Sequence, residues 1–109
     1  MSQRVAKIES LIQAVVAPRL AELLERDSAG VTVTRVDASP DLRNATVWLG
    51  LLGSEAEQDR LWSRVEAVRG ELQAALAGHM AIKYAPRLQF KRDSGGEDAA
   101  RMERLLREL

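Results

Sequence analysis

The sequence has 109 residues, which is the length of one domain with a modest hydrophobic core. Sixteen basic and sixteen acidic residues give a net charge of zero, and 46% of the residues are hydrophobic. There is no run of about 18 apolar residues, no charged and then apolar leader, and no cysteine. We therefore expect a globular protein of the cytoplasm, with no membrane span, no disulfide and no thiolate zinc site.

The first predicted element is a helix over residues 4–26. Its apolar side chains recur every three to five residues, which is the spacing of one helix face: Val5, Ile8, Leu11, Ile12, Val15, Leu20, Leu23 and Leu24. Pro18 interrupts this stripe. Because proline lacks the amide hydrogen and its ring crowds the preceding turn, we expect a kink or break near Val16 and Ala17.

Two strands are predicted next, over residues 31–37 and 44–51. Both segments alternate and are rich in β-branched side chains, and the short polar turn between them favours antiparallel pairing. One face of the second strand carries Ala45, Val47, Leu49 and Leu51, and the other carries Asn44, Thr46 and Trp48. The pattern leaves open whether Trp48 lies under a helix or on an exposed face.

A long helical pattern begins after Ser54, which forms with Glu57 a capping box at the helix start. The pattern continues through Leu61, Val65, Val68, Leu72, Ala75 and Leu76. Gly70 lies inside it, and an interior glycine costs about 1 kcal/mol relative to alanine. Gly70 therefore indicates either close backbone packing or a bend, and Gly78 is the predicted end of the helix.

A third strand is predicted over residues 87–92, with Leu88 and Phe90 toward the core and Gln89 and Lys91 away from it. A glycine-containing loop and an amphipathic helical stretch follow. We divide the chain into a domain over residues 1–93 and a tail over residues 94–109, which could pack, stay mobile or meet a partner. Three strands with helices on one face make an α+β fold.

The sequence contains no recognisable set of catalytic residues. His79 is the single histidine, is most simply a solvated residue at a helix end, and no phosphate-binding glycine loop is present. We predict no enzyme, no cofactor and no metal site.

Residues 81–93 hold Lys83, Arg87, Lys91 and Arg92 against Asp93 alone, which indicates either a solvated edge or a basic surface for a partner. Trp62 is expected at the core edge, and Tyr84 is the aromatic best placed for base stacking.

Several segments, taken in order over nearly the whole chain, resemble the ribosome-binding factor A family. The matching positions are Arg4, Val5, Ile8, Ile12, Val31 to Thr34, Ser39 to Arg43, Ala45, Val47, Met80, Pro86, Leu88, Phe90, Asp93, Arg101, Met102, Leu105 and Leu106. The resemblance implies a type II KH-like domain of the order helix-strand-strand-helix-(kink)-helix-strand. Many KH domains clamp single strands with a GXXG loop, which this sequence lacks.

The family is similar in lacking that loop and has an Ala-X-Gly kink in its place. The corresponding residues here are Val68, Arg69 and Gly70, with Val68 standing where the family usually has alanine. Pro18 is a second departure, and the usual Asp-Pro-Arg run before the first strand is reduced to residues 27–29.

The resemblance also implies a function, namely binding of the small ribosomal subunit and its rRNA, with assistance in late maturation of the 5′ region. It implies no catalysis, and we expect a monomer. The basic residues predicted to contact phosphates are Arg69, Lys83, Arg87, Lys91 and Arg92, with Arg43 and Arg4 as secondary candidates. Two alternatives stay open: a protein–protein interaction module, favoured by the zero net charge and the amphipathic tail, and a KH-like regulator of messenger RNA.

Overall fold

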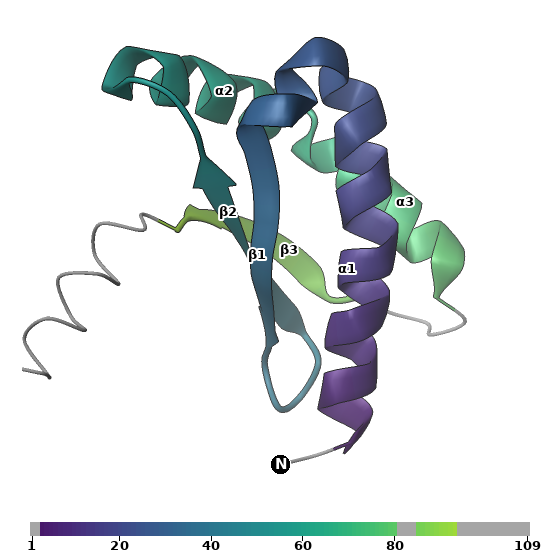
Figure 1. The fold of residues 1–109 in the computed structure, drawn as a ribbon. Helices are drawn as coiled ribbons and strands as arrows, with labels where there is room; N and C mark the ends of the chain where they lie inside the picture. The colour runs from purple at the N-terminus through teal and green to yellow at the C-terminus, as the bar shows by residue number, and fades with distance from the viewer. Residues whose placement is uncertain (1–2, 81–84, 94–109) are drawn as a thin grey trace, which may run out of the picture.

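The computed structural model describes residues 3–80 and 85–93, which form three helices and a three-stranded sheet (Figure 1). The elements are α1 (Gln3–Leu24), the 3-10 helix η1 (Glu25–Gly30), β1 (Val31–Ala38), β2 (Asn44–Leu51), α2 (Glu55–Ala67), α3 (Arg69–His79) and β3 (Arg87–Arg92). β2 is the central strand, antiparallel to β1 and parallel to β3. The predicted α+β, KH-like element order is confirmed, whereas the predicted tail lies outside the described residues.

The predicted break in the first helix is wrong. α1 runs without interruption through Pro18, whose ring is exposed to solvent. Residues on both sides of the proline are buried in the core, among them Val16 and Leu20. Because packing of the apolar face stabilises a helix more than local propensity does, the cost of one interior proline is offset here.

β1 contains a bulge that the sequence pattern did not predict. Val33 pairs with Leu49 and Arg35 pairs with Trp48, so Thr34 is an extra residue with no partner on β2. The bulge shifts the alternation by one position, so that Val33 before it and Val36 after it both face the core. Without the bulge, strict alternation would have turned Arg35 toward the core.

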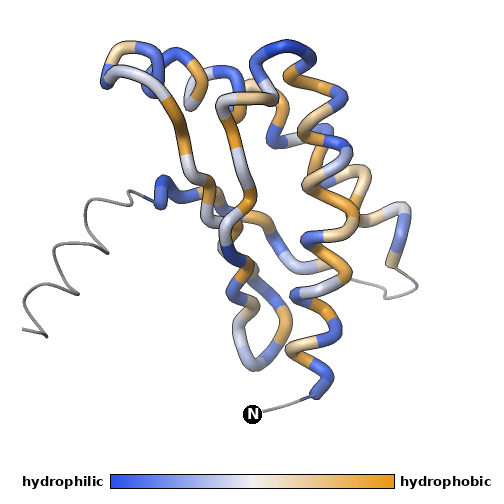
Figure 2. The backbone as a smooth tube through the Cα atoms, viewed as in Figure 1, coloured by the Kyte–Doolittle hydropathy of each residue, from blue (hydrophilic) through white to orange (hydrophobic). Residues whose placement is uncertain are grey.

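The hydrophobic core lies between the helices and one face of the sheet. Apolar and polar residues alternate along the strands in Figure 2, and the inward residues of β2 and β3 are buried with those of the helices. The fully buried side chains include Ile12, Leu24, Val47, Leu49, Val65, Leu72 and Leu76. Within the described residues, no helix is long and apolar enough to cross a membrane.

α2 begins at the predicted cap. Ser54 Oγ accepts a hydrogen bond from the Glu57 amide at 3.2 Å, and the same hydroxyl donates to Glu57 Oε1 at 3.2 Å. Glu57 therefore closes the cap on the Ser54 side chain rather than on the Ser54 amide. One orphan backbone donor at the helix start, the Glu57 amide, is therefore satisfied by the predicted cap residue, whereas the predicted return bond to the Ser54 amide is not formed.

The helical pattern over residues 55–79 is two helices, which separate at Val68. This residue leaves the helical region at φ −104° and ψ 7°, and its side chain packs against the core. A Cβ built on Gly70 would meet nothing within 4 Å, so close backbone packing is not the reason for that glycine. Gly78 is not the end of α3, which continues to His79.

Candidate RNA-binding surface

Two of the predicted phosphate contacts meet at the junction of α3 and β3. Arg69 opens α3 and Arg87 opens β3, and both side chains are exposed. They line a common hollow of about 290 Å³ together with Gly70, Gln73, Ala85 and Leu88. Among the described residues, neither arginine forms an ion pair. Within the part of the chain that the structure describes, the hollow therefore carries two positive charges with no carboxylate partner.

A partly buried amide holds the two elements of this hollow together. Gln73 Nε2 donates to the Pro86 carbonyl at 2.9 Å, and the Leu88 amide donates to Gln73 Oε1 at 2.8 Å. The Gln73 side chain thus satisfies one backbone group just before β3 and one within it, on the edge away from β2, as a neighbouring strand would. Sequence analysis missed this residue, because nothing in the sequence distinguishes it from a solvated helical glutamine.

Arg43 lies next to Arg87 at the other side of β3. Its carbonyl accepts the Arg87 amide at 2.8 Å, so the two residues are joined through the backbone. The Arg43 side chain is exposed, with Nε 3.9 Å from Asp41 Oδ2. Hydrogen bonds from the Ser39 hydroxyl and the Arg43 amide hold the pKa of Asp41 below its usual value. Asp41 therefore stays ionised and compensates part of the Arg43 charge.

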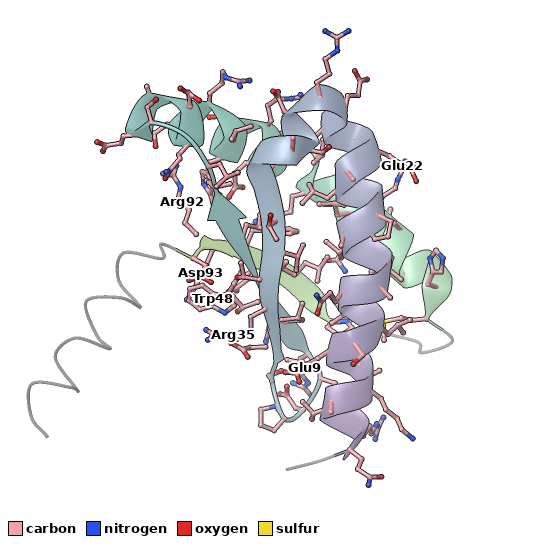
Figure 3. All side chains as sticks on the ribbon, viewed as in Figure 1. Glu9, Glu22, Arg35, Trp48, Arg92 and Asp93 are labelled. Carbon is pink, nitrogen blue, oxygen red and sulfur yellow. The ribbon has the colours of Figure 1, made fainter. Side chains whose placement is uncertain are left out.

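Arg4 is exposed in the first turn of α1. Glu9 accepts the Ala38 amide at 2.8 Å, which places this end of α1 beside the end of β1, as Figure 3 shows for Glu9. The end of β1 leads directly into the turn that carries Arg43. No contact in the described structure joins the Arg4 side chain to the other candidate cations.

Lys91 and Arg92 lie on opposite faces of the sheet. Lys91 projects to the outer face, the face away from the helices, where Nζ lies 5.6 Å from the centre of the Trp48 ring. Arg92 faces α2, where it donates to Asp59 Oδ1 at 2.8 Å, and its guanidinium lies 5.2 Å from the Trp62 ring. Its charge is thus compensated. Lys83 and Tyr84 lie outside the described residues.

The structure also shows where the two tryptophans lie. Trp48 lies on the outer face of the sheet, which settles the alternative that the sequence left open (Figure 3). Trp62 packs at the edge of the core, as predicted. His79 is exposed at the end of α3, with Nδ1 2.9 Å from the Ala75 carbonyl oxygen.

A second cluster of arginines stabilises the fold and is not free to bind a partner. Arg64 donates to the Leu23 and Leu24 carbonyls at the end of α1, at 3.2 and 2.9 Å, and to Asp27 Oδ2 at 2.6 Å. Arg60 donates to both oxygens of Asp27, at 3.0 and 3.2 Å. Hydrogen bonds from Arg60 and then Arg64 lower the pKa of Asp27 to about 2. These contacts tie α2 to the end of α1 and occupy both guanidinium groups.

Helices on one face of a three-stranded mixed sheet, with a helix break at Val68 where a glycine clamp would lie, define this protein as a KH-like α+β domain. A family model described as "Ribosome-binding factor A" matches residues 4–106. The chain belongs to the ribosome-binding factor A family.

Similar proteins agree with this assignment. The chain is 37% identical to the ribosome-binding factor A of Rubrobacter xylanophilus, over 97% of this chain and 87% of that protein. The solution structure of a Thermotoga maritima protein described as a putative ribosome binding factor A superposes with a TM-score of 0.72 at 27% identity. That similarity covers 87% of this chain and 92% of the other.

A homology model of the Thermus thermophilus factor superposes with a TM-score of 0.57 at 21% identity, over 84% of this chain and 93% of the other. That homology model was fitted into a cryo-EM map of a complex between the 30S subunit and the factor. At this level of identity the similarity concerns the fold alone.

Proposed function

We propose that this protein binds the small ribosomal subunit through its rRNA and assists late maturation of the 5′ region of that RNA. Membership of the ribosome-binding factor A family supports ribosome binding. The observation that carries the RNA contact is the hollow in which Arg69 and Arg87 meet without a carboxylate partner among the described residues. The protein acts in the cytoplasm as a monomer and makes no covalent change itself.

Physical chemistry links the hollow to RNA. An arginine guanidinium is planar and donates two parallel hydrogen bonds to phosphate oxygens, which gives geometry as well as attraction. Gln73 fixes the backbone of the two elements that carry these groups, so little backbone freedom is lost on binding. A protein that binds one rRNA conformation better than the others raises the population of that conformation. Binding alone is therefore sufficient to assist maturation.

The seven predicted phosphate contacts are not equivalent in this proposal. Arg69 and Arg87 form its centre, and Arg43 joins them through the backbone of Arg87. Arg92 contributes least, because a phosphate would have to displace Asp59 from it. Lys91 on the outer face and Arg4 in α1 stay proposed contacts outside the hollow. Lys83, which lies outside the described residues, also stays a proposed contact.

The experiment is sedimentation of the purified protein with purified small subunits, with large subunits as the control. Three phosphate contacts give a slope of log K against log salt of about −2 to −3, so binding weakens about 20- to 40-fold between 50 and 200 mM salt. Binding to neither subunit would remove the proposed function. Binding to small subunits that is insensitive to salt and to Arg87→Glu would instead favour the protein–protein interaction module.

A further inference from the structure

The outer face of the sheet carries one aromatic side chain between two cations. Trp48 lies on the central strand β2, and the sheet register places Arg35 of β1 and Lys91 of β3 opposite it on the two flanking strands. The Arg35 guanidinium carbon lies 4.8 Å from the centre of the Trp48 ring, and Lys91 Nζ lies 5.6 Å from it. Figure 3 shows Trp48 and Arg35 on the side of the sheet opposite α1. We call these three residues the outer-face cluster.

The bulge in β1 creates this cluster. Because Thr34 is an extra residue, Arg35 points to the outer face instead of the core. The Thr34 hydroxyl donates to Asp93 Oδ2 at 2.7 Å, which ties the bulge to the end of β3. A bulge interrupts the hydrogen-bond ladder, and such interruptions often re-aim a side chain at a binding site. Here it brings an arginine to the ring of Trp48.

One carboxylate, that of Asp37, contacts both the Trp48 ring and Arg35. Asp37 Oδ2 accepts the Trp48 indole Nε1–H at 3.0 Å and lies 3.0 Å from Arg35 Nε, so one carboxylate orients both groups. Lys91 forms no ion pair among the described residues. Among the residues described, Lys91 thus places one positive charge without a carboxylate partner beside a partly exposed aromatic ring. Thr46 and Gln89 are paired across the strands next to it.

We propose that the outer-face cluster binds an unpaired nucleotide of single-stranded RNA, with the base against Trp48 and a phosphate on Lys91. This inference rests on the proposed function and adds a second contact surface to the hollow. Aromatic side chains on an open sheet face are a recurring platform for unpaired bases, and an adjacent cation supplies the phosphate contact. The hydrogen-bonding groups of Thr46 and Gln89 are suited to the edge of a base.

The geometry of β3 connects the two surfaces. Arg87 and Lys91 are separated by four residues and therefore point to the same face of the strand, about 13 Å apart along it. An extended RNA strand that leaves the hollow along β3 would thus reach the outer-face cluster. The predicted apolar stripe of the tail, with Met102, Leu105 and Leu106, is a poorer match to this polar and charged face.

The test is an NMR titration of the full-length protein with a short oligouridine, which reads the indole Nε1–H resonances of Trp48 and Trp62. Trp62→Phe assigns the two signals. The proposal expects the Trp48 resonance to shift and the Trp62 resonance to stay. Trp48→Thr, which keeps a good strand former, should weaken oligouridine binding by about 5- to 150-fold. Lys91→Gln should weaken it and lower the salt slope by about one, whereas Arg19→Gln should change neither.

A Trp48 resonance that does not move on addition of oligouridine would overturn the proposal. If Trp48 also shows contacts to residues 94–109, the outer face would be assigned to the tail. Sedimentation of the wild-type protein with small subunits is measured separately. Intact sedimentation with an unmoved Trp48 resonance therefore removes only this second surface, while lost sedimentation removes the proposed function.

Discussion

Gln73 offers the sharpest test of how the candidate surface is built. Replacing Gln73 by leucine keeps the approximate size of the side chain but removes both hydrogen bonds to β3, of 2.9 and 2.8 Å. The Pro86 carbonyl and the Leu88 amide then lose their partners. An unsatisfied buried group costs about 1–3 kcal/mol, and two groups are affected here. Because the hollow beside Gln73 admits water, which can replace part of the lost hydrogen bonding, we expect the lower end of the summed range. The free energy of unfolding should therefore fall by about 2–3 kcal/mol.

This loss is large enough to measure by two independent methods. With an unfolding entropy of about 2.1 cal/mol/K per residue, a change of 2–3 kcal/mol in a 109-residue chain lowers Tm by about 9–13 °C. Chemical denaturation should report the same free energy with an unchanged m-value. Native-state hydrogen exchange should show faster exchange at the Leu88 amide, because that amide has lost its acceptor.

Gln58→Leu is the matched control. Gln58 is also a helical glutamine that donates to a backbone carbonyl, that of Gly53 at 3.0 Å, but this bond is exposed. Its removal should change the free energy of unfolding by about 0.5 kcal/mol or less. A Gln73→Leu variant as stable as the Gln58→Leu variant would refute the claim that one amide fixes β3 against α3. Gln73→Leu should also bind the small subunit more weakly, because the backbone at Arg87 is no longer held against α3.

Three further predictions follow from other contacts. Gly70→Ala and Gly78→Ala should each raise the free energy of unfolding by about 0.5–1 kcal/mol, since neither Cβ meets an atom within 4 Å. Only Gly70→Ala should weaken subunit binding, because only Gly70 lines the hollow; equal binding by the two variants would argue against RNA entry there. The folded-state pKa of Asp27 is about 2, below its ordinary 3.8, so its ion pairs stabilise the fold above about pH 4. The difference in unfolding free energy between wild type and Asp27→Asn should therefore shrink as the pH falls from about 4 to 2. A constant difference would contradict a lowered pKa of Asp27 in the folded protein. Arg64→Met should lower the free energy of unfolding by about 1–3 kcal/mol, because carbonyls at the end of α1 lose their donor. Arg60→Met, which loses exposed contacts only, should cost less in the same denaturation measurement.

Local sequence patterns predicted most of the fold. The second and third strands were predicted with the bounds that the structure has, because alternation of apolar residues is strong there. The cap at Ser54 was predicted from residue types at fixed spacing. The break predicted near Pro18 does not occur, because the cost of the proline is local, whereas the compensation comes from core residues in other elements. The bulge at Thr34 left one signal, namely that Arg35 occupied a core position of the predicted strand.

The candidate surface was harder to predict than the fold. The basic residues could be read from the sequence, but their neighbours could not. Asp59 compensates Arg92 across 33 residues of sequence, and only the packing of α2 beside the sheet brings the two together. Gln73 reaches β3 from α3 across a similarly non-local contact. Charge pairing and backbone satisfaction depend on tertiary contacts, which composition and periodicity do not encode.

The most direct measurement is equilibrium binding to purified small subunits of two double variants with equal changes in charge. Arg69→Glu with Arg87→Glu alters the hollow, whereas Arg19→Glu with Arg26→Glu alters two arginines that do not line it. We expect the first variant to bind about 100-fold or more weakly, because two charged hydrogen bonds are lost, and the second to stay close to wild type. Equal affinities of the two variants would contradict the claim that this surface binds RNA.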